Sequence, residues 1–216
     1  MKRAIIFING TLSKDKQFYQ DYIKPKDLIA CADGGAKHAY LLKITPDLII
    51  GDLDSLSSEI IKHYQNQGVN FEKFPVEKDK TDTELLLDKL ITKDYDELII
   101  FAGLGDRFDH TLANIYLLEK YTDFKTRVRF VTPQERIELI TNKIKLNNKK
   151  NKTISLVPLT DKVTGVTLSG FKYVLNNATL KRGSTLGISN IIQSNQAQIK
   201  VKTGKLLIII NNYLKT

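Results

Sequence analysis

Short apolar runs alternate with stretches of helical periodicity through the first part of the chain, and turn-forming residues separate them. Such runs are typical of buried β-strands, and we predict strands at 3–8, 27–32, 48–50, 69–74, 97–102 and 128–131. We predict helices near 15–22, at 36–42, from 58 to Gly68, from 82 to about 91, and at 111–118. This alternation predicts an α/β fold with a doubly wound, mostly parallel sheet and helices on both of its faces.

Two of the predicted helices carry start signals. Ser57 is placed as an N-cap, and Leu56 and Ile61 have the spacing of a hydrophobic staple across it. Thr81 and Glu84 have the spacing of a capping box, so the next helix is predicted to begin directly after Thr81.

The pattern changes after about Pro133, where helical periodicity stops. Short alternating segments follow between Gly, Asn and Ser clusters, and we predict strands at 136–140, 153–158, 163–168, 198–202 and 205–210. We therefore predict two domains, an α/β domain over residues 1–133 and a small antiparallel, β-sandwich-like domain over residues 134–216. A β domain of this size is small for an independent core, so we expect it to bury a face against the first domain or a second subunit.

The composition, 42% hydrophobic and 26% charged residues, is that of an ordinary globular protein. No apolar run is long enough to span a membrane, and the single cysteine, Cys31, excludes an internal disulfide and lies in an apolar stretch where burial is expected. We expect a cytoplasmic protein without a membrane partner. The net charge of +9 favours anionic ligands. The one lysine cluster, at 143–152, is interpreted as a solvated loop, so no nucleic-acid partner is expected.

Two aspartates follow the apolar run 48–50. Asp52 and Asp54 are two residues apart, so their side chains are predicted to leave the strand end on one side. Carboxylates roughly 6 Å apart repel by about 2–3 kcal/mol at an effective dielectric near 20. Mg²⁺ relieves such repulsion, because it binds one or two carboxylates together with waters and phosphate oxygens. Taken alone, the pair is better explained as a solvated acidic turn, and the other motifs of the chain are what favour a metal site.

Glycine-rich turns follow two other predicted strands, at 33–35 and 103–110. Paired glycines let backbone amides approach a phosphate, although a tight turn also explains them. The second turn lacks the third glycine of a dinucleotide-binding fingerprint, but it carries Arg107, whose guanidinium matches phosphate oxygens. Glycine-rich and charged clusters at several strand ends predict a functional site along one edge of the sheet.

A second acidic stretch spans residues 77–84. Asp82 falls in the first turn of the predicted helix, where the macrodipole stabilises negative charge. That structural role and a role as a third metal-site acid are both open at this point. In the second case Lys78 or Lys80 is expected to face phosphate.

In this order and spacing, five stretches resemble the thiamine pyrophosphokinase (thiamine diphosphokinase) family over nearly the whole chain. The stretches are Asp33-Gly34-Gly35, Pro46-Asp47 with Gly51-Asp52-Leu53-Asp54-Ser55, Asp79-Lys80-Thr81-Asp82, Gly103 to His110, and Gly187-Ile188-Ser189-Asn190. The resemblance implies an enzyme that transfers a pyrophosphoryl group from ATP to the hydroxyl of thiamine, giving thiamine diphosphate and AMP. It also implies Mg²⁺ and a homodimer whose active sites lie at the subunit interface, where the β domain helps to hold thiamine.

The resemblance also assigns roles to individual residues. The implied catalytic residues are Asp52, Asp54, Asp82, Arg107 and Asp109. The implied metal ligands are Asp52, Asp54 and Asp82, with Asp79 as a further member. The implied nucleotide-binding residues are Asp33, Gly34, Gly35, Lys80, Thr81, Gly103, Gly105, Arg107, His110 and Asn114. The implied thiamine-binding residues are Ser189 and Asn190.

One departure from the family concerns thiamine. Some members stack a tryptophan of the β domain on thiamine, and this chain has no tryptophan. The aromatic side chains considered in its place are those of Phe171, Tyr173 and Tyr213. The general base is also open, with Asp109 as a candidate to accept the thiamine hydroxyl proton.

Two other functions fit parts of the sequence. A phosphatase that forms an aspartyl-phosphate also suits Asp-x-Asp after an apolar strand, but it gives the 103–110 turn and the β domain no role. A basic RNA-binding module suits the net charge, but acids clustered at strand ends would repel a phosphate backbone.

Overall fold

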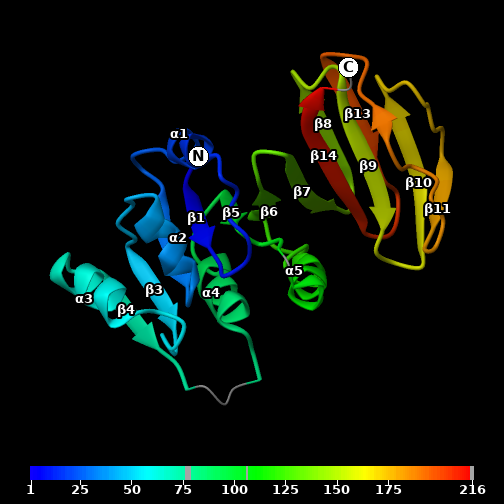
Figure 1. Cartoon of the computed structure of the whole chain (residues 1–216). Helices are drawn as coiled ribbons and strands as arrows, with labels where there is room; N and C mark the ends of the chain where they lie inside the picture. Colours follow the sequence, from blue (N-terminus) through cyan, green and yellow to red (C-terminus); the bar gives the residue numbers. More distant parts are fainter. Residues whose placement is uncertain (76–78, 106, 215–216) are drawn as a thin grey trace. The chain divides into compact units, whose positions relative to one another are not determined.

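The structure, a computed structural model, describes residues 1–75, 79–105 and 107–214. For residues 213 and 214 it describes the backbone without the side chains. Lys78 and the side chain of Tyr213 therefore lie outside the described part. The chain divides into two compact units, Met1–Pro133 and Gln134–Thr216, which are described separately below (Figure 1).

The first unit is built on a six-stranded parallel sheet with the strand order β6-β5-β1-β2-β3-β4. Its strands are β1 (Arg3–Phe7), β2 (Leu28–Ala32), β3 (Leu48–Gly51), β4 (Asn70–Lys73), β5 (Glu97–Phe101) and β6 (Arg127–Val131). Every residue of β1 and β5 is buried, as expected of central strands covered on both faces. From β1 the chain moves to β2, β3 and β4 on one side and then returns to β5 and β6 on the other. The strand order thus reverses between β1 and β5, and such a switch point is where ligands bind in open α/β sheets.

Five helices connect these strands: α1 (Lys16–Tyr22), α2 (Gly35–Leu41), α3 (Ser58–Asn66), α4 (Asp82–Ile91) and α5 (Phe108–Lys120). Buried side chains of α1, α2 and α3 join one apolar layer with β1, β2, β3 and β5. Helix α4 packs on β2 and β3. It lies on the opposite face, because right-handed crossovers place it there when the chain returns across the sheet.

Both predicted helix caps are confirmed. The Ser57 hydroxyl accepts a hydrogen bond from the Ile60 amide at 3.4 Å, and the Thr81 hydroxyl accepts one from the Glu84 amide at 3.2 Å. Helix α5, in contrast, begins at Phe108, one turn earlier than predicted. The Phe108 side chain is 73% exposed, so apolar periodicity gives no signal for the first turn.

The core of this unit contains a set of edge-to-face aromatic contacts. The Phe101 ring lies 5.4 Å from that of Phe7 and 5.0 Å from that of Tyr19, which joins β5, β1 and α1. Each such pair contributes about 0.5–1.5 kcal/mol beyond its buried area. Cys31 is fully buried in the same layer, and burial raises the pKa of its thiol. This confirms that Cys31 is a packing residue.

The second unit is a sandwich of two antiparallel sheets, ordered β12-β9-β14-β7 and β11-β10-β13-β8. Its strands are β7 (Glu135–Ile140), β8 (Lys143–Asn147), β9 (Lys152–Pro158), β10 (Lys162–Ser169), β11 (Ala178–Lys181), β12 (Asn190–Ile191), β13 (Gln196–Lys200) and β14 (Leu206–Leu214). Apolar side chains of both sheets form one buried cluster. The predicted fold class, a parallel α/β unit followed by a small antiparallel β-sandwich, is confirmed.

The interpretation of residues 143–152 as a solvated loop was only partly right, because only residues 148–151 form a turn between strands. Residues Lys143–Asn147 form strand β8, which pairs with β13. Lys143 and Lys145 are exposed, whereas Ile144 and Leu146 between them are buried. The alternation of apolar and charged residues therefore predicts this strand better than the number of charges does, because each lysine lies on the solvent face of the sheet.

No helix among the described residues is long and apolar enough to cross a membrane.

Candidate active site

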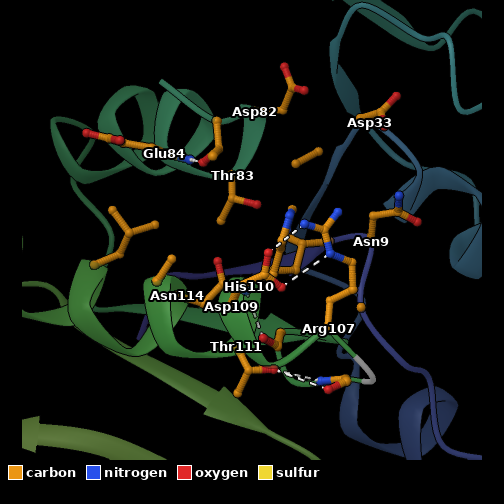
Figure 2. A pocket seen from close by; sticks show the side chains of 18 of the residues that line it. Asn9, Asp33, Asp82, Thr83, Glu84, Arg107, Asp109, His110, Thr111 and Asn114 are labelled. Atoms are coloured by element: carbon orange, nitrogen blue, oxygen red, sulfur yellow. Dashed lines mark hydrogen bonds and ion pairs between the residues drawn. The ribbon is translucent and has the colours of Figure 1, made fainter. Parts of the chain in front are cut away.

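A cavity of about 650 Å³ opens at the switch point between β1 and β5. Its walls come from the turn after β1, the end of β2, the start of α4, and the loop and helix after β5 (Figure 2). The lining segments are 8–11, 32–33, 81–84 and 103–117, each of them in part or in full. The site therefore lies along one edge of the sheet, where the carboxyl ends of parallel strands meet.

The loop after β5 is tied to helix α5. The Asn114 side-chain amide donates to the Gly103 carbonyl at 2.8 Å, and the Gly105 amide donates to the Thr111 hydroxyl at 3.0 Å. Gly103 has no room for a side chain, because an added Cβ would lie 2.2 Å from the Phe130 ring. The predicted residues Gly103, Gly105 and Asn114 thus form one wall of the cavity.

Arg107 and Asp109 form an exposed, two-pronged ion pair at the mouth of this loop. Arg107 Nε lies 3.2 Å from Asp109 Oδ1, and an Arg107 terminal nitrogen lies 2.5 Å from Oδ2 (Figure 2). The hydrogen bond from Arg107 lowers the pKa of the Asp109 carboxyl, and the same bond raises the pKa of Arg107. A carboxylate with a lowered pKa is a weak proton acceptor, so this geometry favours Asp109 as the group that orients Arg107 rather than as the general base.

Three aspartates gather beside this cavity. Carboxylate oxygens of Asp33, Asp52 and Asp54 all lie within 4.8 Å of one another. Asp33 directly follows β2, and the other two follow β3, which pairs with β2, so the two strand ends lie side by side; Asp33 has a positive φ of 42° and Leu53 one of 69°. Gly51 permits this approach, because an added Cβ would lie 3.0 Å from the Asp33 Cβ. Of these three aspartates, only Asp52 and Asp54 were predicted as metal ligands, because the pairing of β2 with β3 that brings Asp33 to them is not displayed in the sequence.

The aspartate trio, Asp33, Asp52 and Asp54, has the donor set that Mg²⁺ prefers. The Asp33 Oδ1 atom is buried and has no hydrogen-bond partner among the described residues. A buried, unpaired carboxylate oxygen costs free energy unless a cation or donor meets it. Three carboxylates at this spacing fit a hard cation bound by oxygen ligands.

The other two predicted metal ligands lie elsewhere. Asp82, the first residue of α4, lines the cavity together with Asp33 but is not a member of the trio. Asp79 is exposed and belongs to neither group within the described chain.

Lys80 is engaged away from the cavity. Its ammonium lies 2.9 Å from Asp88, which also accepts from Lys120 and, at 3.0 Å, from the Tyr121 hydroxyl. Burial alone would raise the pKa of Asp88, but the hydrogen bonds from these three groups lower it overall. Lys120 pairs with Glu84 as well, at 2.8 Å. The network fastens α4 to α5, the two helices that contribute to opposite walls of the cavity.

The two glycines after Asp33 serve packing. A Cβ on Gly34 would lie 2.3 Å from the Asn9 side chain, and one on Gly35 would lie 2.1 Å from the Phe7 carbonyl oxygen. Helix α2 can therefore start directly against β1. In the described structure neither glycine lines the cavity.

Seven of the residues predicted for nucleotide binding line the cavity. They are Asp33, Thr81, Gly103, Gly105, Arg107, His110 and Asn114. Several other lining residues were not predicted for the site: Asn9, Gly10, Thr11, Thr83, Glu84 and Thr111. Asn9 and Gly10 have the composition of a simple turn, and their place beside β5 depends on a strand order that the sequence does not display.

The predicted thiamine motif lies in the second unit. Asn190 is 3% exposed, and both ends of its side-chain amide are engaged: the oxygen accepts from the backbone amides of Tyr173 at 3.0 Å and Ile191 at 2.8 Å, and the nitrogen donates to the Tyr173 carbonyl at 2.7 Å. Asn190 therefore holds the chain at Tyr173 beside β12. Ser189 has a positive φ of 58°, and its amide donates to the Ser155 hydroxyl at 3.1 Å.

The aromatic candidates for thiamine stacking differ in exposure. Phe171 is 3% exposed and packs in the core of the sandwich, whereas Tyr173 is 58% exposed. The side chain of Tyr213 lies outside the described part of the chain.

Comparisons with known proteins agree with the two-unit division of these features. Residues 19–131 match the family model "Thiamin pyrophosphokinase, catalytic domain", and residues 141–208 match "Thiamin pyrophosphokinase, vitamin B1 binding domain". The chain is 33% identical over 168 residues to the thiamine pyrophosphokinase of Bacillus subtilis, an alignment that covers 77% of this chain and 78% of the relative.

Solved structures give the same picture. A crystal structure of thiamine pyrophosphokinase from Bacillus subtilis superimposes with a TM-score of 0.88 and 28% identity, over 99% of this chain and 100% of that one. The corresponding protein of Geobacillus thermodenitrificans superimposes with a TM-score of 0.85 and 28% identity, over 99% of this chain and 98% of that one. These matches support neither the phosphatase nor the RNA-binding module.

Proposed function

The chain belongs to the thiamine pyrophosphokinase family, and we propose that it transfers a pyrophosphoryl group from ATP to the hydroxyl of thiamine in a Mg²⁺-dependent reaction. The products are thiamine diphosphate and AMP. The observation that carries this proposal is the aspartate trio at the strand ends, beside a cavity that also presents Arg107.

The residues of the trio would hold Mg²⁺, with Asp82 facing the same cavity. Once bound, the ion would offset negative charge on the phosphate oxygens of ATP. Asp33 is the strongest candidate ligand of the three, because its buried Oδ1 has no other partner in the described structure.

The remaining groups of the cavity position ATP and stabilise charge. The Arg107 guanidinium, held in orientation by Asp109, is placed to neutralise phosphate oxygens, and the backbone amides of the 103–105 loop lie beside it. In the transfer, the thiamine hydroxyl oxygen bonds to the β-phosphorus while the bond from that phosphorus to the α,β-bridging oxygen breaks. AMP leaves with the bridging oxygen, and the hydroxyl proton passes to solvent. Positioning and charge stabilisation account for most of the catalysis in phosphoryl transfer.

The second unit would supply the thiamine site. We assign Asn190 a positioning role, because its amide is occupied by backbone groups of Tyr173 and Ile191. Ser189, which precedes it, and the exposed ring of Tyr173 remain for direct contact with thiamine. Tyr173 takes the place of the tryptophan that this chain lacks.

We also propose a homodimer in a reducing cytoplasm. Helix α5 carries an exposed apolar stripe of Phe108, Leu112 and Tyr116, spaced one turn apart beside cavity residues. Such a stripe suits burial against a second copy. Light scattering of the purified protein tests this assembly, and a monomer at assay concentration would contradict it.

One assay tests the proposed reaction. The protein is incubated with ATP, Mg²⁺ and thiamine, and nucleotides and thiamine phosphates are separated by chromatography. We expect AMP and thiamine diphosphate in equal amounts. ADP with thiamine monophosphate would refute the two-phosphate transfer, and phosphate release without thiamine would favour the phosphatase instead.

A further inference from the structure

His38 is a titratable group that the proposed mechanism does not use. It lies on α2, and its Nε2 atom is 2.8 Å from the carbonyl oxygen of Gly10. A carbonyl oxygen only accepts, so Nε2 carries the proton and donates. The Nδ1 atom is buried and has no partner among the described residues, and burial lowers the pKa of the imidazole. The ring is therefore neutral near pH 7 and serves as a fixed donor to Gly10.

Gly10 belongs to a turn that is fastened on its other side. Its amide donates to the Ala102 carbonyl at 2.9 Å, and the Thr11 amide donates to the Leu104 carbonyl at 3.0 Å. The fit is close, because a Cβ on Gly10 would lie 2.3 Å from the Ala102 oxygen. The turn 9–11 is thus held between α2 on one side and the loop after β5 on the other.

The same line of hydrogen bonds continues to α5. The Gly105 backbone amide donates to the Thr111 hydroxyl, and the Asn114 side-chain amide donates to the Gly103 carbonyl. Asn9, Gly10 and Thr11 line the cavity, as do Gly103 and Gly105. Two of the cavity walls are therefore spaced by a chain of contacts that starts at His38, a residue that does not itself line the cavity.

We propose that His38 is a positioning residue for the nucleotide pocket: its hydrogen bond to Gly10 fixes the turn 9–11, and through it the loop 103–105, at the spacing that ATP requires. This inference rests on the proposed function. His38 touches none of the reacting groups, so its loss acts on ATP binding and not on the transfer step.

Three substitutions separate the donated hydrogen bond from mere bulk. In His38→Gln the terminal amide can reach the Nε2 position and donate to Gly10, whereas in His38→Asn the amide is too short. In His38→Leu the donor is absent. We expect His38→Leu and His38→Asn to raise the KM for ATP roughly three- to tenfold, the range for one lost hydrogen bond. We expect kcat and the KM for thiamine to stay within twofold, and His38→Gln to stay near the parent protein in all three constants.

The matched control is His63→Leu. His63 lies on the neighbouring helix α3 and does not line the cavity. It is expected to leave the KM for ATP unchanged. Steady-state kinetics and calorimetric binding of a non-hydrolysable ATP analogue with Mg²⁺ are measured for every variant, together with the thermal midpoint.

Two results would overturn the inference. One is a lower thermal midpoint for His38→Leu or His38→Asn with ATP affinity within twofold of the parent, which would make His38 a purely structural residue. The other is equal loss of ATP affinity in His38→Gln and His38→Asn, which would show that the donated bond is not the cause. If His38→Leu does not fold, the Gln and Asn pair decides. A parent protein that forms no AMP with thiamine refutes the proposed function instead, and ATP-analogue binding still tests His38.

Discussion

Replacing Asp52 by Asn is expected to stabilise the metal-free protein while it removes activity. Two carboxylates 4.8 Å apart, the upper limit within the trio, repel by about 3 kcal/mol at an effective dielectric near 20. Asp52→Asn removes two of the three pairwise repulsions and keeps an oxygen to accept from the Asp54 amide, as Asp52 does at 3.1 Å. Asp54 is exposed and the other two are half-buried, so solvent screening reduces the net gain to about 1–2 kcal/mol.

Thermal unfolding measures this gain directly. In excess EDTA, we expect the midpoint of Asp52→Asn to lie roughly 2–8 °C above that of the parent protein. In excess Mg²⁺ the parent is stabilised by ion binding, and the variant gains much less, because one of the three ligands has lost its charge. Turnover of ATP with thiamine is expected to fall about 100-fold or more, as when a group that stabilises transition-state charge is removed.

The matched control is Asp94→Asn, an exposed aspartate in a loop away from the cavity. It removes the same charge and is expected to change neither the Mg²⁺ response nor turnover. The reasoning is refuted if Asp52→Asn keeps turnover within about threefold of the parent, a barrier difference of only ~0.65 kcal/mol. A lower midpoint in EDTA would contradict the charge argument separately.

Three further substitutions test other parts of the structure. Arg107→Lys keeps the charge but loses the fork that faces phosphate, so the KM for ATP is expected to rise tenfold or more, roughly, in steady-state titrations; a change within twofold would contradict this. Lys120→Met removes a donor to Asp88, whose carboxyl pKa is lowered in the folded state. The Lys120–Asp88 pair therefore stabilises the folded protein at pH values above the ordinary carboxyl pKa, and this stabilisation is lost as the pH falls through the lowered pKa of Asp88. Urea unfolding should therefore show a deficit of up to about 1 kcal/mol near pH 7 that shrinks below about pH 4, and a deficit independent of pH would refute the pairing. Asn190→Ala leaves backbone groups of Tyr173 without partners and is expected to cost about 1–3 kcal/mol of unfolding free energy; a loss under 0.5 kcal/mol, roughly the scatter of surface substitutions, would argue against the positioning role.

Local signals in the sequence were sufficient for much of the fold. The central strands are continuous apolar runs because both faces of a parallel sheet are covered, and the caps at Ser57 and Thr81 depend only on residues one turn away. Strand β8 was missed because its lysines were weighed as charge, although Ile144 and Leu146 alternate with them.

The candidate site was predictable only where its residues follow one strand. Asp52 and Asp54 are visible as a pair, but Asp33 joins them because β2 pairs with β3, a pairing that the sequence does not display. In the same way, the turn at Asn9 and Gly10 lies in the cavity wall because β1 pairs with β5, and these two strands are far apart in the chain. Long-range strand order therefore limits what can be inferred about the site.

A crystal structure with Mg²⁺ and a non-hydrolysable ATP analogue tests the central claim most directly. We predict an ion within coordination distance, about 2.1 Å, of carboxylate oxygens from the aspartate trio, with Arg107 against the phosphates of the analogue. An ion and phosphates bound away from Asp33, Asp52 and Asp54 would contradict the account.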